Sequence, residues 1–266
     1  MTATARLPRR LRAEAAVAVS GSGVALALGY LLLTGIGGLA ETWLAVAAPA
    51  GFGVAVYLRR NLPDNHPADG TVAGLRRTLG VANAVTLARG LAYAGAAGFL
   101  FVPRTTAVAA LPAVLYGGGV LLDAVDGVVA RRVGQTTRLG ERLDMAYDTL
   151  GFVVAPAVAV AWGRLPAVYL ALAAARYLYR AGLTVERRRG RRIRPLPPGR
   201  FRRPLAGWQM LFLTVALSPV VPATTLHAVA PVALAPSLLV FARDYLAVTG
   251  RLPRHGTDPS GRPADD

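Results

Sequence analysis

The chain contains no cysteine and no lysine among its 266 residues. Without cysteine, disulfide bonds, thiolate metal sites and cysteine nucleophiles are excluded. Without lysine, all thirty basic residues are arginine, so any site that needs a positive side chain must use a guanidinium group. Histidine is also rare: His66, His227 and His255 are scattered along the chain, and we expect no shared histidine metal site.

Acidic residues are scarce and unevenly placed. Fourteen acids stand against thirty arginines, and the net charge is +16. Between Val72 and Ala242 there are only six acids, and four of them are the aspartates of the stretch 123–148. This stretch joins two long apolar runs, where a charged side chain is costly and usually functional.

Hydrophobic residues make up 54% of the chain, and they lie in runs of roughly twenty, the length that crosses a bilayer as a helix. We therefore predict an all-α, polytopic membrane helix bundle. Two spans, at about 15–36 and 43–58, precede a polar loop at 61–70. Six more follow, at about 84–102, 107–125, 144–163, 165–184, 205–220 and 226–246. The predicted domains are a two-helix segment with its linker (1–70), a six-helix domain (71–250) and a disordered polar tail (251–266).

The arginines predict the orientation of these spans. They cluster in every second connection, at 6–12, 59–77, 131–142, 187–203 and 251–254, whereas the alternate loops hold only Arg104 and Arg164. Basic residues accumulate on the cytoplasmic side of a membrane. We therefore expect a multi-pass protein of the cell membrane, with both termini and the 126–143 loop in the cytoplasm.

The four aspartates form two pairs with helical spacing. Asp123 and Asp126 are three residues apart at the predicted end of one span, and Asp144 and Asp148 are four apart at the start of the next. Each pair shares a helix face, and the second pair would gain from the helix macrodipole. Carboxylates brought together without a cation repel one another, and oxygen-only ligands suit Mg²⁺, Mn²⁺ or Ca²⁺ rather than Zn²⁺. The alternative is an ordinary loop whose acids balance the neighbouring arginines.

The whole stretch reads Asp-x2-Asp-Gly-x2-Ala-Arg-x8-Gly-x3-Asp-x3-Asp, which fixes eight positions. It resembles the signature of the CDP-alcohol phosphatidyltransferase family without a departure, and the six later spans resemble that family's membrane domain. The resemblance implies that Asp123, Asp126 and Asp144 bind metal.

 The implied cofactors are thus two divalent ions, Mg²⁺ or Mn²⁺. Asp148 would be the general base and a further ligand.

The same resemblance implies a nucleotide-diphosphate pocket and a reaction. Gly127, Ala130, Arg131 and Gly140 would line the pocket. An acceptor hydroxyl would attack the β-phosphorus of a CDP-linked lipid such as CDP-diacylglycerol, and CMP would leave. The product would be a phosphodiester in phospholipid synthesis. The implied partners are the CDP-linked lipid, a small or phosphorylated alcohol, the bilayer and a second copy of the chain in a homodimer; we expect no nucleic acid.

Two alternatives stay open at this point. A soluble CDP-alcohol donor with a lipid acceptor would use the same signature. A cation transporter could also use clustered acids, although transporters place such acids near the membrane midplane, whereas these are predicted at helix ends. Metal-dependent CMP release would separate the enzyme from the transporter.

Asn83, Thr86 and Arg89 recur at three-residue spacing where the third span begins, and they could share a helix face. They resemble the family's Pro-Asn-x2-Thr-x2-Arg entry motif, with Ala82 in place of the proline. We therefore expect them at the nucleotide pocket. The alternative is a helix start with a snorkelling arginine.

Four further arginines are candidates for binding an anionic acceptor. Arg176 and Arg180 are four residues apart in the sixth span, and Arg200 and Arg202 lie in the basic loop that follows it. The loop resembles a Gly-Lys-x-Lys-Thr stretch of phosphatidylglycerophosphate-type members, with arginine for lysine and Pro204 for threonine. Such a loop is also what positive-inside topology and anionic lipid would favour.

Overall fold

The computed structural model describes residues 7–36, 38–68, 74–133, 136–196 and 199–252, with 125–133 described by their backbone alone. Across these residues the fold is all-helical, apart from an isolated antiparallel bridge between Pro67 and Thr137. The helices are α1 (Arg9–Thr34), α2 (Leu39–Asn61), α3 (Val81–Ala97), α4 (Leu111–Val133), α5 (Arg138–Ala161), α6 (Leu170–Arg188), α7 (Arg202–Leu217) and α8 (Ala223–Val248). The predicted fold class is confirmed in this form.

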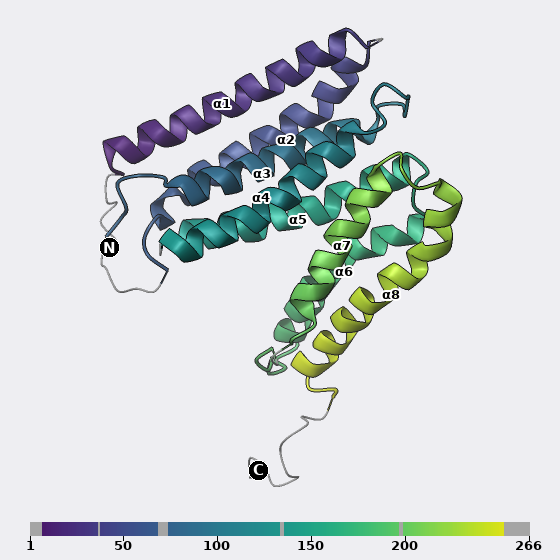
Figure 1. The fold of residues 1–266 in the computed structure, drawn as a ribbon. Helices are drawn as coiled ribbons and strands as arrows, with labels where there is room; N and C mark the ends of the chain where they lie inside the picture. The colour runs from purple at the N-terminus through teal and green to yellow at the C-terminus, as the bar shows by residue number, and fades with distance from the viewer. Residues whose placement is uncertain (1–6, 37, 69–73, 134–135, 197–198, 253–266) are drawn as a thin grey trace.

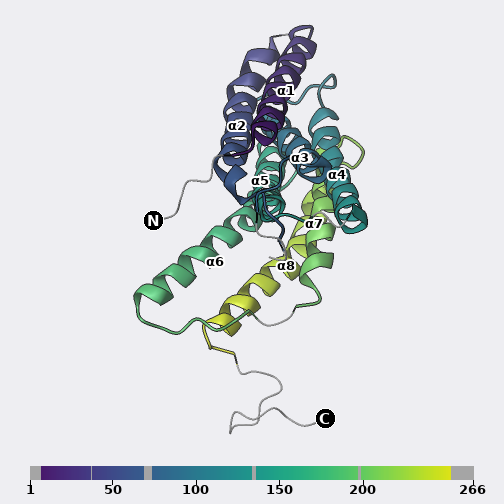
Figure 2. The ribbon, with the colours of Figure 1, turned by 90° about the vertical axis from the view of Figure 1, so that its left-hand side faces the viewer.

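The helices form two groups. Figure 1 shows α1–α5 running nearly side by side, with α6–α8 inclined to them. In the turned view of Figure 2, α6 lies at the periphery of the second group. Two clusters of buried apolar side chains hold the helices together, and the larger one draws residues from both groups. Burial of apolar surface is therefore continuous across the two groups.

Four of the described helical segments are long and apolar enough to cross a membrane: Arg9–Thr34, Leu39–Asp64, Arg138–Ala161 and Ala223–Val248. They support a multi-pass membrane protein. In their described residues, α3, α4, α6 and α7 are not both long enough and apolar enough to meet this criterion. α3 and α7 have 17 and 16 residues, and α6 has 19 but includes several arginines. Membrane crossing by these four helices, and the orientation of all eight, stay predictions.

The two N-terminal helices pack tightly on α3. Trp43 of α2 lies against Gly29, Gly95 and Gly98, and its indole Nε1 donates to the carbonyl of Gly95 at 2.9 Å. A Cβ at Gly98 would come within 2.4 Å of the Trp43 ring, so only glycine leaves room for it. At the other end of α2, Tyr147 of α5 donates its hydroxyl to the carbonyl of Val54 at 3.1 Å. α1 and α2 are thus part of the bundle.

α4 and α5 extend further toward each other than the apolar runs predict. α4 continues to Val133, and α5 already begins at Arg138, where Thr137 caps it by accepting from the Gly140 amide at 3.0 Å. The prediction that Asp144 begins a helix was wrong, because hydropathy follows the bilayer whereas the capping residue decides where the helix starts. The macrodipole acts within the first turn. It therefore contributes little at Asp144 and Asp148.

The ends of α6 and α8 are tied together by a buried acid. Glu186 is 3% exposed and pairs with Arg191 and Arg251, each at 2.9 Å. Burial acts to raise the pKa of Glu186, but the hydrogen bond from Arg191 and the surrounding arginine charges outweigh it. The pKa of this carboxyl is therefore lowered from its ordinary value. The ion pairs join the end of α6 to the residues that follow α6 and α8.

Candidate active site

Two helices bring three of the predicted acids together. Asp123 comes from α4, and Asp144 and Asp148 come from successive turns of α5. One carboxylate oxygen from each lies within 4.8 Å of the others, and all three residues are partly buried. Their side chains are 36%, 49% and 29% exposed, in that order. The cluster is thus accessible to an ion or a substrate from one side.

Arg89 of α3 closes the buried side of this cluster. Its side chain is fully buried, and it donates to Asp123 and to Asp144. The Asp148 carboxylate lies 3.5 Å from the same guanidinium. Arg89 was expected at the nucleotide pocket, and in the structure it is the charge partner of the acids. Three carboxylates against one guanidinium leave two negative charges at the site, which suits a divalent cation held by oxygen ligands.

Four predicted residues of the signature lie in the last part of α4, residues 125–133, of which only the backbone is described. Asp126, Gly127, Ala130 and Arg131 all fall within the helix Leu111–Val133, but their side chains lie outside the described residues. Asp126 is one turn beyond Asp123, so the backbone places the two on one helix face. Their expected roles stay predictions.

Asn83 and Thr86 of α3 and Gly140 of α5 lie on the helices that carry Arg89, Asp144 and Asp148, and they contact other protein groups. Asn83 is 4% exposed and donates through Nδ2 to the carbonyl of Leu79 at 2.7 Å and to Thr137 Oγ1 at 3.3 Å. Thr86 is 5% exposed and donates to the carbonyl of Ala82 at 3.0 Å. A Cβ at Gly140 would lie 2.8 Å from Asn83 Oδ1, so this glycine lets α5 approach α3 closely.

Two buried tyrosines were not predicted to lie near the site. Tyr93 is one turn beyond Arg89 on α3, and Tyr116 is two turns before Asp123 on α4. Both are fully buried, with ring centroids 5.2 Å apart. A Cβ at Gly119 would come within 2.4 Å of the Tyr93 ring. The spacings of four and seven residues place these rings on the faces that carry the charged groups, and this periodicity was the signal available in the sequence.

Comparison with known families identifies the chain. The profile of the CDP-alcohol phosphatidyltransferase family matches residues 79–243, which is more than half of the protein. The chain belongs to the CDP-alcohol phosphatidyltransferase family. It is therefore a transferase of the EC 2.7.8 type, and the resemblance seen in the sequence is confirmed. Comparisons with curated proteins and with solved structures give no match.

The matched region of this phosphatidyltransferase leaves out α1, α2 and the segment that follows them. The match begins at residue 79, two residues before α3, and ends at residue 243 within α8. Arg89, Asp123, Asp144 and Asp148 all lie inside it. The first two helices are therefore additions to the part of the chain that carries the family match.

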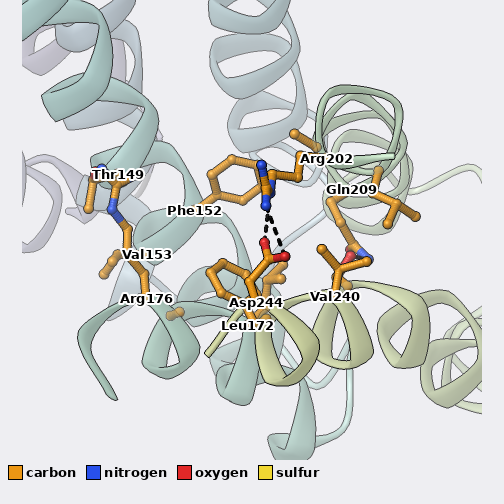
Figure 3. Close-up of a pocket in the computed structure, with 14 residues that line it drawn as sticks. Thr149, Phe152, Val153, Leu172, Arg176, Arg202, Gln209, Val240 and Asp244 are labelled. Carbon is orange, nitrogen blue, oxygen red and sulfur yellow. Dashed lines mark hydrogen bonds and ion pairs between the residues drawn. The ribbon is translucent and has the colours of Figure 1, made fainter. Parts of the chain in front are cut away.

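A second feature of the phosphatidyltransferase is a cavity of about 190 Å³ among α5, α6, α7 and α8. Its walls are mainly apolar, and Figure 3 shows Arg202 and Asp244 paired with each other among the lining residues. Arg202 pairs with Asp244 through two hydrogen bonds, of 2.6 and 2.9 Å. Arg176 of α6 also lines the cavity. Thr149, the residue after Asp148 on α5, lines it as well.

The buried glutamine Gln209, which lines this cavity, forms hydrogen bonds to several neighbouring residues. Gln209 of α7 is 1% exposed and donates to Ser237 Oγ at 2.9 Å and to the carbonyl of Ala233 at 2.7 Å. It accepts a hydrogen bond of 2.5 Å from the Tyr169 hydroxyl. Gln209 thereby holds α7 against α8 and against the start of α6.

The four candidate acceptor-binding arginines separate into two pairs. Arg176 and Arg202 line the cavity. Arg180 and Arg200 are exposed and are not among its lining residues. The guanidinium of Arg200 lies 6.0 Å from the centroid of the neighbouring Phe201 ring. Arg176 and Arg202 are thus the two of these four arginines that line the cavity.

Proposed function

We propose that this phosphatidyltransferase moves a phosphatidyl-type group from a CDP-linked lipid to an alcohol acceptor and releases CMP. The carboxylate cluster around Arg89 is the single observation that carries the proposal. Its three ligand atoms within 4.8 Å suit a divalent cation, and the family match assigns the reaction class. A membrane-embedded chain is also suited to a lipid donor such as CDP-diacylglycerol.

The acids would hold Mg²⁺ or Mn²⁺. Asp123, Asp144 and Asp148 supply oxygen ligands, Asp126 is a further candidate, and the proposal allows two ions. A bound cation neutralises charge on the diphosphate and on the departing phosphate. Arg89 holds Asp123 and Asp144 in place from the buried side, so their carboxylates converge before any substrate arrives. Such preorganisation lowers the reorganisation needed during reaction.

Asp148 is the proposed general base. It accepts the proton of the acceptor hydroxyl while the acceptor oxygen forms a bond to the β-phosphorus. The bond from that phosphorus to the bridging oxygen breaks, and CMP leaves with its electron pair. Asp148 suits this role because its carboxylate is part of the cluster and its side chain is partly exposed. Gly127, Ala130, Arg131 and Gly140, with Asn83 and Thr86, are proposed for the nucleotide side.

The cavity lined by Arg176 and Arg202 is the proposed acceptor site. Its two guanidinium groups suit a phosphorylated alcohol, since arginine binds phosphate through paired hydrogen bonds. Arg202 would then exchange Asp244 for the acceptor phosphate. We propose that this site opens to the cytoplasm, as the distribution of arginine indicates.

A panel of acceptors tests this proposal. Purified protein in lipid nanodiscs receives CDP-diacylglycerol, Mn²⁺ or Mg²⁺, and one of glycerol phosphate, inositol phosphate, inositol or serine. CMP and labelled lipid are measured together, and we expect both to form in equal amounts with a phosphorylated acceptor. The lipid-donor proposal fails if CMP forms only from a soluble CDP-alcohol with diacylglycerol as acceptor. It also fails if no CMP forms with any pair and vesicles show metal-dependent cation flux.

A further inference from the structure

The segment 61–68, which joins α2 to the region before α3, is bonded to the residues that start α5. The carbonyl of His66 accepts from the Arg138 amide at 3.0 Å, and the Ala68 amide donates to the carbonyl of Thr136 at 3.2 Å. Between them, Pro67 and Thr137 form the antiparallel bridge. This segment lies outside the family match. It nevertheless contacts the connection between the two helices that carry the acids.

A buried polar hub strengthens this attachment. Asn65 is fully buried, and its Nδ2 donates to the carbonyl of Thr78 at 2.8 Å. Its Oδ1 accepts from Asn83 Nδ2 at 3.3 Å, and Asn83 reaches Thr137 Oγ1 at the same distance. Thr137 caps α5 through the Gly140 amide. The hub of Asn65, Asn83 and Thr137 thus joins the segment 61–68, the first turn of α3 and the N-terminus of α5.

A second contact lies one turn further along α5. Arg142 pairs with Asp64 at 2.7 Å and donates to Asn61 Oδ1 at 3.1 Å. The side chains of Arg142 and Asp64 are 54% and 27% exposed. An exposed ion pair of this kind adds little to stability. The pair does, however, restrict rotation of α5, the helix whose N-terminus Thr137 caps.

The hub and the acids lie on one side of α5. Asp144 and Asp148 follow Thr137 by seven and eleven residues, which are close to two and three full turns of an α-helix. A rotation or a shift of α5 about its capped end would therefore move both carboxylates relative to Arg89. α3 carries Asn83 and Arg89, so the hub connects the two helices whose relative register sets the site.

We infer that Asn65 is a positioning residue for the carboxylate cluster, acting through Asn83 and Thr137. The inference rests on the proposed function and assigns a role to the segment between α2 and α3. Asn65 does not touch the reacting groups; it fixes the rotation of α5, and thereby the places of Asp144 and Asp148. Groups that orient metal ligands from behind affect metal affinity and activity without binding the metal.

The test uses the full chain in nanodiscs with Asn65→Leu, which keeps the size of the side chain and removes its hydrogen bonds. We expect the Mn²⁺ concentration for half-maximal CMP release to rise about tenfold or more, as for other groups behind metal ligands. We also expect kcat to fall, because displaced carboxylates would stabilise the transition state less well. Ser22→Ala, which removes a buried hydroxyl of α1, serves as the control. Thr137→Ser retains the cap and should keep wild-type metal dependence, whereas Thr137→Val should not.

Hydrogen exchange of residues 138–148 provides a readout that does not depend on activity. We expect faster exchange in Asn65→Leu than in the wild type and in Ser22→Ala. Arg142→Leu, which removes only the exposed contact, should shift exchange and metal dependence in the same direction by a smaller amount. If Asn65→Leu does not fold, the same two measurements on Arg142→Leu test the inference. Unchanged exchange and unchanged metal dependence in the folded variants would overturn the inference. If exchange rises but the wild type releases no CMP, the proposed function fails while the hold of the hub on α5 stands.

Discussion

Arg89 of α3 and Asp144 of α5 are joined by a charged hydrogen bond although they are 55 residues apart in the chain. The guanidinium is fully buried, whereas the carboxylate side chain is 49% exposed. Arg89 therefore belongs to the core, and the acids extend from it toward the accessible side. Because the same guanidinium also binds Asp123, it sets the distance between α4 and α5 at the site.

Removal of this guanidinium should make folding depend on metal. In Arg89→Gln, three neighbouring carboxylates lose their positive partner, and we expect a lower thermal midpoint. The loss should be smaller than the ~3–5 kcal/mol of a fully buried ion pair, because the acids are partly exposed. Mg²⁺ or Mn²⁺ should raise the midpoint of Arg89→Gln more than that of the wild type, as measured by thermal unfolding in detergent with and without EDTA. Arg104→Gln, at an exposed position, is the control; an equal metal shift in all three proteins would refute this charge balance.

Asp148→Asn should abolish turnover while the CDP-linked lipid still binds. The amide keeps the shape of the side chain but cannot take up the hydroxyl proton, and general-base loss typically lowers rates by about 10²–10⁴-fold. CMP release gives kcat, and protection against thermal unfolding by CDP-diacylglycerol gives binding. Glu41→Gln, on α2, should behave as the wild type. Wild-type CMP release by Asp148→Asn would remove Asp148 from its proposed role.

Arg176→Ala should weaken binding of a phosphorylated acceptor. The loss of a charged hydrogen bond should raise the acceptor KM by about tenfold or more, with little change in KM for the CDP-linked lipid. Initial rates over a range of acceptor concentrations provide the measurement. Arg188→Ala, in the last turn of α6, supplies a matched loss of charge outside the cavity. An equal rise in acceptor KM in both variants would indicate a general effect of charge rather than a site at Arg176.

Glu186 should make stability depend on pH. Its pKa is lowered in the folded protein, since the arginine contacts outweigh the effect of burial. The carboxylate therefore stabilises the fold above the ordinary pKa of glutamate, and this contribution is lost as the pH falls through the lowered value. We expect Glu186→Gln to lower the thermal midpoint at pH 7 and the difference from wild type to shrink toward pH 4. A difference that stays constant over this range would contradict the ion-pair account, and Glu41→Gln controls for loss of an exposed acid.

The sequence was a good guide to the carboxylates and a poorer one to their surroundings. The spacing of Asp123, Asp144 and Asp148 predicted their convergence because helical periodicity and two adjacent spans suffice for it. The pairing of Arg89 with these acids depends on the packing of α3 against α4 and α5, which no local pattern encodes. For the same reason the hydrogen bonds of Asn83 to Asn65 and Thr137 were not predicted, and its role at the nucleotide pocket stays a prediction.

The helix ends show a second limit of the sequence. Apolar runs predicted the number of helices correctly, yet α5 begins six residues before the predicted start because Thr137 caps it. The polar loop 61–70 was interpreted as a boundary between domains. In the structure His66 and Ala68 of this loop form backbone hydrogen bonds to Arg138 and Thr136 at the start of α5, a contact between segments that only folding brings together.

The most direct test of the account is the metal dependence of CMP release. The protein is treated with EDTA and supplied with CDP-diacylglycerol, an acceptor and increasing Mn²⁺, Mg²⁺ or Zn²⁺, with Asp123→Asn and Glu41→Gln measured beside the wild type. We predict no CMP without metal, recovery with Mn²⁺ or Mg²⁺ but not Zn²⁺, and a half-maximal metal concentration that rises at least about tenfold in Asp123→Asn alone. CMP release that survives EDTA, or an Asp123→Asn variant with the wild-type metal requirement, would contradict the assignment of the carboxylate cluster as the metal-binding active site.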